Sequence, residues 1–152
     1  MKKITFLIML LIGFSACKKT ETEPDYTVNY IGTFSQNIVN YVSVDSNSKI
    51  SYKFIFTKKD NNTLLSTFFL SYTGRIKGIL YDSRNSINLT NIKVTQTQLK
   101  INESVIVNIS NSKFTNLVTG TGTLTGNTIA LDLTIEDPGI AKETQKLTLI
   151  KE

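Results

Sequence analysis

The chain lacks histidine and tryptophan, and it has only one cysteine and two prolines among 152 residues. Without histidine, the commonest general base and metal ligand is missing, so any catalysis would rest on carboxylates, lysines or hydroxyls. A single cysteine excludes a disulfide within the chain. A nucleophilic or metal-binding cysteine would also need histidine or further thiols beside it. We therefore expect no enzymatic activity, no metal and no cofactor.

The carboxylates do not supply a catalytic pair either. Asp132 lies between Leu131 and Leu133 in a predicted strand, so its side chain is expected on the polar face. Other acidic residues lie next to Asn, Ser, Gly or Pro in predicted turns, where a carboxylate caps backbone amides. These are Asp45, Asp60, Asp82, Glu136 and Asp137.

The first residues predict an exported protein with a lipid anchor. Lys2 and Lys3 precede an apolar run of about eleven residues that ends at Phe14, too short to span a bilayer, which takes ~20 residues. The stretch FSAC that ends at Cys17 resembles the lipobox of bacterial lipoproteins. The resemblance implies cleavage between Ala16 and Cys17, a diacylglyceryl group on the Cys17 sulfur and acylation of the new amine. The alternative is an ordinary secretory signal, cut near Ala16, that leaves a free thiol.

The segment 17–29 is expected to tether the domain to a membrane. The stretch KKTETEPDYT is polar, alternates in charge and contains Pro24, so it cannot bury enough surface to order itself. Three acyl chains at ~0.8 kcal/mol per buried CH₂ would anchor the protein permanently. Some lipoproteins carry an aspartate after the cysteine that retains them at the inner membrane. Lys18 stands there instead, which implies an outer-membrane lipoprotein facing the periplasm or the surface.

The charge balance gives no reason to expect a nucleic-acid partner. The chain has 17 basic and 12 acidic residues, and two of the lysines leave with the signal, 1–16. No Lys/Arg cluster with interleaved aromatic residues is present. The expected partners are therefore the membrane, through the acyl anchor, and either a small apolar ligand or another envelope protein.

The remaining chain, 30–152, predicts a single all-β domain. Ile50, Tyr52, Phe54 and Phe56 alternate with more polar residues, the pattern of a strand with one buried face. Gly126 and Asn127 predict a two-residue hairpin loop. Further turns are expected at 60–62, 73–75, 83–86 and 136–139. We expect about eight to ten antiparallel strands in an up-and-down meander that closes into a small barrel, with a two-sheet β-sandwich as the alternative, because either arrangement protects strand edges.

Two stretches carry a second resemblance. YIGTF (30–34) and GTGTLTGNTIALDLTI (120–135) resemble the opening and late strands of small lipocalin-like, or calycin-like, bacterial lipoproteins. The resemblance implies a barrel that binds a small apolar or amphipathic ligand, with Tyr52, Phe54 and Phe56 as contact residues. The same aromatic residues are also explained as core. An eight-stranded barrel either fills with side chains or holds one small ligand.

The sequence therefore leaves two functions open. The first is a non-enzymatic lipoprotein that holds a ligand inside the barrel. The second is a structural or interaction lipoprotein that contacts another envelope protein through its loops or a sheet face. The adjacent Phe68 and Phe69 must face opposite ways in a strand, so one of them is a candidate contact residue.

Overall fold

The computed structural model describes residues 23–39, 48–76, 79–109, 112–136 and 142–152. The predicted signal, Ala16 and Cys17 therefore lie outside the described residues, as do Asp45 and Asp137.

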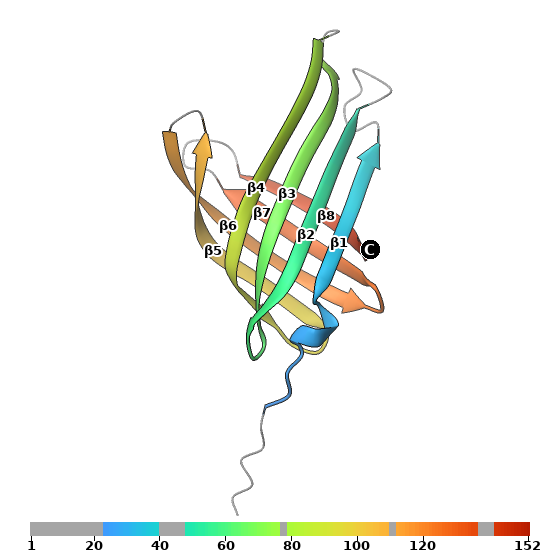
Figure 1. The fold of residues 1–152 in the computed structure, drawn as a ribbon, viewed down its shortest axis with the longest axis vertical. Helices are drawn as coiled ribbons and strands as arrows, with labels where there is room; N and C mark the ends of the chain where they lie inside the picture. The colour runs from blue at the N-terminus through green and yellow to red at the C-terminus, as the bar shows by residue number, and fades with distance from the viewer. Residues whose placement is uncertain (1–22, 40–47, 77–78, 110–111, 137–141) are drawn as a thin grey trace, which may run out of the picture.

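Eight strands follow one short 3-10 helix, η1, and form a closed barrel (Figure 1). Each strand pairs antiparallel with the next, and β8 pairs with β1, which confirms the all-β up-and-down barrel. The elements are η1 (Thr27–Asn29), β1 (Gly32–Val39), β2 (Lys49–Asp60), β3 (Thr63–Ile76), β4 (Ile79–Val94), β5 (Gln98–Ile109), β6 (Ser112–Thr125), β7 (Thr128–Glu136) and β8 (Glu143–Lys151).

Tight turns close several of the hairpins as expected. Asn61 and Asn62 join β2 to β3, and Asn62 has a φ of 55°, a left-handed conformation that asparagine tolerates. Gly126 and Asn127 join β6 to β7, and Gly126 has a φ of 57°. Both turns therefore use residues that accept positive φ.

Two other expected turns are wrong, because β3 and β4 form one long hairpin. Residues 73–75 lie within β3 and residues 83–86 within β4, so Asp82 is a strand residue. Gly74 was expected to mark a turn, but it is buried: a Cβ there would lie 2.7 Å from the Tyr72 hydroxyl and 2.9 Å from Ser48 Cβ. Glycine is needed at this position because Tyr72 and Ser48 pack closely against the backbone there.

The barrel is closed unevenly. β4 and β5 are in register at only two positions, Lys93 with Lys100 and Val94 with Leu99. β1 and β8 likewise share two register positions. Beyond these two narrow seams, the sheets β1–β4 and β5–β8 diverge at different inclinations (Figure 1). The molecule is thus a barrel at the end that carries η1 and opens toward the other end.

Aromatic side chains fill the closed end. Phe54 lies 4.5 Å from Phe68 and 5.6 Å from Phe56, measured between ring centroids, and Phe34 lies 5.7 Å from Phe56. All four rings are buried. They face aliphatic residues of the opposite sheet, among them Val118, Leu131, Leu147 and Leu149. Aromatic pairs at such separations each add about 0.5–1.5 kcal/mol beyond their buried area.

Adjacent side chains of a strand face opposite sides of the sheet, as predicted for Phe68 and Phe69. Along β3, Phe68 is 1% exposed and its neighbour Phe69 is 38% exposed. The two rings therefore face opposite sides of the sheet, as expected.

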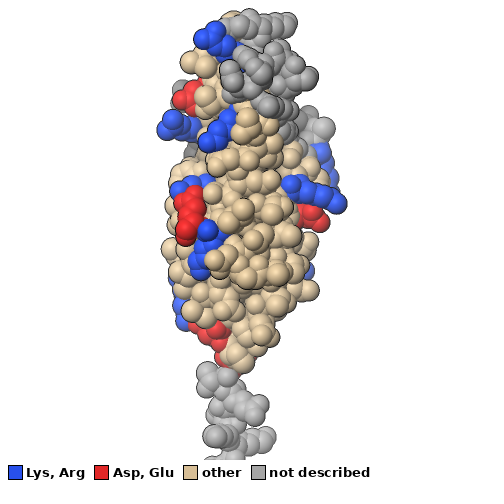
Figure 2. Space-filling view, turned by 90° about the vertical axis from the view of Figure 1, so that its right-hand side faces the viewer, with Lys and Arg blue, Asp and Glu red and all other residues tan. Residues whose placement is uncertain are grey.

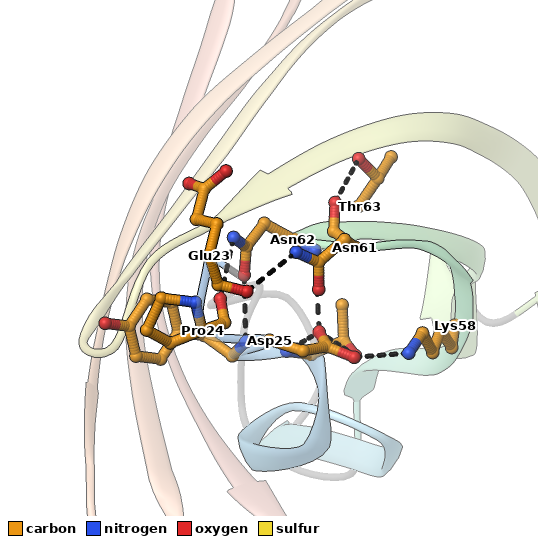
Figure 3. A network of polar contacts seen from close by, with 9 residues as sticks. Glu23, Pro24, Asp25, Lys58, Asn61, Asn62 and Thr63 are labelled. Atoms are coloured by element: carbon orange, nitrogen blue, oxygen red, sulfur yellow. Dashed lines mark hydrogen bonds and ion pairs between the residues drawn. The ribbon is translucent and has the colours of Figure 1, made fainter. Parts of the chain in front are cut away.

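Residues 23–26 are fastened to the β2–β3 turn (Figure 3). The side-chain amides of Asn61 and Asn62 donate to the carbonyl oxygens of Glu23 (3.1 Å) and Pro24 (2.9 Å). The Tyr26 amide donates to Asn62 Oδ1 at 2.8 Å. The chain that the sequence assigned to the tether as far as residue 29 thus makes specific contacts with the barrel from Glu23 on.

Candidate functional site

The aromatic candidates lie in the core. Tyr52, Phe54 and Phe56 all point inward and are at most 4% exposed. The cavity that Tyr52 lines with Leu70, Leu133, Ile135 and Gln145 has a volume of about 30 Å³. Pockets for small molecules typically measure about 300–1,000 Å³. In this conformation, the cavity beside Tyr52 has room for about one or two water molecules.

A larger opening lies where β4 and β5 separate. This cleft has a volume of about 640 Å³, and its walls are residues 84–88 of β4 and 103–107 of β5. Ile87, Val105 and Val107 contribute apolar surface, while the other walls are largely polar. We call it the seam cleft.

Glu103 spans the lower edge of the seam cleft. Its carboxylate accepts hydrogen bonds from the backbone amides of Thr90 (2.7 Å) and Asn91 (3.1 Å), and from the Thr90 hydroxyl (2.5 Å). A register shift in the β3–β4 pairing at Leu64 and Ser66 falls opposite these two residues. Glu103 therefore replaces a missing strand partner at the point where the backbone ladder ends.

The strand edges above Glu103 have no register partner across the seam among the described residues. Val105 faces the seam cleft, and Asn116 lies opposite Val105 on β6. Asn116 is 7% exposed, and its Oδ1 accepts no hydrogen bond in the described part of the chain. The opening thus combines two free strand edges with a nearby buried acceptor.

Exposed apolar residues gather at this open end. Ile79, Leu80 and Tyr81 begin β4 at the tip of the long hairpin, and their exposed fractions are 63%, 64% and 46%. Ile106 and Phe114 are exposed near the ends of β5 and β6. The hairpin tip lies at the opposite end of the barrel from η1 (Figure 1).

Charges are scattered over the side of the barrel shown in Figure 2. Lysine, arginine and acidic side chains alternate there among uncharged residues, and no broad field of one sign covers it. Two of the described ion pairs are Lys53 with Glu152 at 3.0 Å and Arg84 with Asp82 at 3.6 Å. The Lys53 hydrogen bond holds the pKa of Glu152 below its usual range.

Asp25 lies where the chain enters the barrel, and several hydrogen-bond donors surround its carboxylate. The Asp25 carboxylate bonds Lys58, the Thr27 hydroxyl (2.7 Å) and the Thr27 amide (3.0 Å), as Figure 3 shows in part. The Lys58 ammonium is the main reason that the pKa of Asp25 falls below its usual range. Asp25 therefore fixes the point at which the chain leaves the barrel.

Tyr30 closes the same end of the barrel from inside. It is fully buried, and its hydroxyl has no hydrogen-bond partner in the described structure. Burial raises the pKa of Tyr30 to about 12, because the phenolate would be desolvated there.

The remaining carboxylates stay apart. Asp60 ends β2, Glu136 ends β7, and Asp132 is exposed on β7 as expected. Among the described residues, no group of three His, Cys, Asp or Glu side chains lies close enough to hold a metal ion.

Sequence reasoning missed the seam cleft. The polar run from Ser83 to Ser86 has the composition of a turn, whereas it lies in a strand and its side chains are all exposed. A polar strand of this kind shows no period-two pattern, so its composition alone predicts a turn.

Comparisons of the chain with protein-family models, with curated proteins and with solved structures find no match. Across the described segments, no helix has the length and apolar character needed to cross a membrane.

Proposed function

We propose that this protein is an outer-membrane lipoprotein without enzymatic activity, anchored through Cys17, that contacts another envelope protein with the open end of its barrel. The observation that carries the proposal is the contrast between the two ends. The closed end is filled by packed aromatic rings, and Val28 and Ile31 are exposed beside η1, whereas the open end exposes three consecutive apolar residues, Ile79, Leu80 and Tyr81. Contiguous exposed apolar residues on a soluble domain mark interaction surfaces.

The chain entry orients this surface. Glu23 is already bonded to the barrel, so the segment from Cys17 to Glu23 spans six residue steps. A fully extended chain covers at most ~3.6 Å per residue, which places Glu23 within about 22 Å of the lipid anchor. The end that carries η1 thus faces the membrane, and the hairpin tip faces away from it.

The seam cleft adds a mode of recognition. Unpaired strand edges accept an extended segment of another chain, since its backbone completes the ladder while its side chains enter neighbouring pockets. Ile87, Val105 and Val107 offer apolar contacts for such a segment. Glu103 stabilises the seam below it, so the partner need not unzip the barrel to bind.

The geometry favours this function over a ligand inside the barrel. A cavity of about 30 Å³ beside Tyr52 is an order of magnitude below the usual size of a ligand pocket. Binding there would require the residues that line this cavity, among them Tyr52, Leu70 and Leu133, to move apart.

Site-specific photo-crosslinking in the producing cell tests the proposal. A photoreactive amino acid at Leu80 should give one discrete crosslinked product, whereas the same probe at Thr57, an exposed residue of β2, should not. Tyr81→Asp should reduce the Leu80 product. In the same cells, Cys17→Ser should release the protein from the membrane fraction. Identical labelling from Leu80 and Thr57 would overturn the interaction surface. Native mass spectrometry that finds a bound small molecule would instead favour the ligand-binding function.

A further inference from the structure

The outer face of β5–β8 has a groove that the proposed function does not use. Its volume is about 690 Å³, within the range of small-molecule sites, and an adjoining hollow of about 370 Å³ shares Lys100, Thr121 and Asp132 with it. The inward-facing Gly120 and Gly122 lie under these hollows. A Cβ at either glycine would come to 3.1 Å from a β7 atom, so the neighbouring atoms would have to shift by a few tenths of an ångström. The glycines thus allow β6 and β7 to approach closely beneath the groove.

One row of residues crosses this groove in register. Lys93 faces Lys100, Lys100 faces Thr121, Thr121 faces Asp132, and Asp132 faces Lys146. All five side chains are exposed. The row thus presents three cations and one anion along a single line on the barrel surface.

The pairing of Lys93 with Lys100 breaks a local rule. Like charges directly opposite one another on neighbouring strands are destabilising. These two residues also form one of only two register positions that close the β4–β5 seam, where stability matters most. Neither lysine, nor Lys146, takes part in an ion pair among the described residues, and the Lys93 ammonium instead donates a hydrogen bond to Thr63 Oγ1 at 2.8 Å. Violations of this kind are typical of functional sites.

The next row supplies neutral hydrogen-bonding groups. Gln98 faces Thr123, Thr123 faces Ala130, and Ala130 faces Thr148. The hydroxyls and the amide can both donate and accept hydrogen bonds, as sugar hydroxyls require. Ala130 has the smallest side chain of this row, so the surface is lower at its position and a ligand can lie flat against it.

We infer that this groove binds the phosphate group of a polyhydroxylated ligand. A phosphate monoester carries a charge of about −1.5 to −2 at neutral pH, which neutralises Lys93 and Lys100 together. A carboxylate carries one charge and leaves one lysine uncompensated. No arginine, the residue suited to bidentate carboxylate binding, lines the groove. The phosphate binds at the lysine pair, and the hydroxyls of the ligand lie along the Gln98 row.

An amide NMR titration tests this inference on the chain from residue 17 on, with Cys17→Ser so that it is free of lipid. Glucose 6-phosphate is the probe, and glucose and glucuronate are the controls. Saturable shifts at Lys93, Lys100 and Thr121 are expected with the phosphate only. The combined change Lys93→Gln and Lys100→Gln should raise the dissociation constant at least about tenfold. Lys113→Gln, an exposed lysine of β6 outside the groove, should leave it unchanged.

Co-sedimentation separates two sources of such a phosphate. Vesicles of phosphatidylcholine with phosphatidylinositol 4-phosphate are compared with pure phosphatidylcholine. Binding to the former that the two lysine changes abolish assigns the groove to a lipid headgroup. Saturable binding of the sugar phosphate without vesicle binding assigns it to a free sugar phosphate. The inference is overturned by a failure of both probes, by glucuronate binding as tightly as the phosphate, or by equal weakening from Lys113→Gln. None of these results depends on the interaction surface proposed above.

Discussion

Replacing Phe68 with alanine should destabilise the barrel far more than replacing its neighbour Phe69. Phe68 is 1% exposed, and its ring centroid lies 4.5 Å from that of Phe54 and 6.4 Å from that of Tyr52. Truncating a fully buried phenylalanine typically costs about 3–5 kcal/mol, because transfer energy is lost and a cavity remains. The stacked contacts with two aromatic neighbours place Phe68→Ala in the upper half of that range.

Phe69→Ala is the matched control. The same side chain is removed from the adjacent position of the same strand, but Phe69 is 38% exposed on the outer face. Only part of its transfer energy is gained on folding, and solvent fills the space it leaves. The expected cost is no more than about 1.5 kcal/mol.

Urea unfolding monitored by circular dichroism measures both costs. The midpoint for Phe68→Ala should fall well below that for Phe69→Ala, with the dependence on urea concentration unchanged. For a domain of this size, the melting temperature of Phe68→Ala should drop by roughly 10–20 °C. Equal costs for the two variants would refute the filled interior. They would mean that Phe68 borders a space kept for a ligand, and the ligand-binding function would regain support.

Four further results are expected. Asp25→Asn should lower the free energy of unfolding relative to the wild type at neutral pH. The depressed pKa of Asp25 contributes stability above its ordinary value of 3.8, so the difference between variant and wild type should shrink as the pH falls below 3.8; a constant difference from pH 7 downward would contradict this. Glu103→Ala should speed hydrogen exchange at the Thr90 and Asn91 amides, without a comparable change elsewhere in β4. Lys100→Gln should raise the free energy of unfolding by about 0.2–1 kcal/mol in urea titrations, because a like-charge pair is removed. Tyr30→Phe should leave stability equal or raised by up to about 1 kcal/mol, since the buried hydroxyl has no partner; a clear loss would reveal one.

The sequence predicted the structure best where one face of a strand is buried and the other is exposed to solvent. Ile50, Tyr52, Phe54 and Phe56 all face the core, as their spacing indicated. The turn at Gly126 was also predictable, because its positive φ is a local requirement of the hairpin. In both cases the local pattern and the tertiary environment demand the same residues.

The long β3–β4 hairpin could not be predicted in the same way. Near its tip both faces of β4 meet solvent, so no alternation of apolar and polar residues is required. Gly74 resembles a turn residue, yet its lack of a side chain is needed because Tyr72 and Ser48 crowd the position. The contact with Ser48 joins residues far apart in the chain and leaves no local signature.

The candidate sites share this difficulty. The seam cleft exists because β4 and β5 stop pairing after two positions, and the groove carries a lysine pair because Lys93 meets Lys100 across that seam. Each lysine is unremarkable within its own strand, and only the register makes the pair unfavourable. The sequence therefore predicted the strands. It did not predict where neighbouring strands stop pairing or where their register places like charges opposite each other.

The packed core and the proposed contact surface lie at opposite ends of the barrel. The closed end holds the stacked aromatic rings and the ion pair of Asp25 with Lys58, so substitutions there are expected to destabilise the fold. The open end has few buried side chains to lose, and exposed positions such as Leu80 can change with little effect on folding. A domain built this way can vary its contact surface while its core stays fixed. The crosslinking variants at Leu80 and Tyr81 should accordingly unfold at the same urea concentration as the wild type, and a marked loss of stability in either would show that the open end also supports the fold.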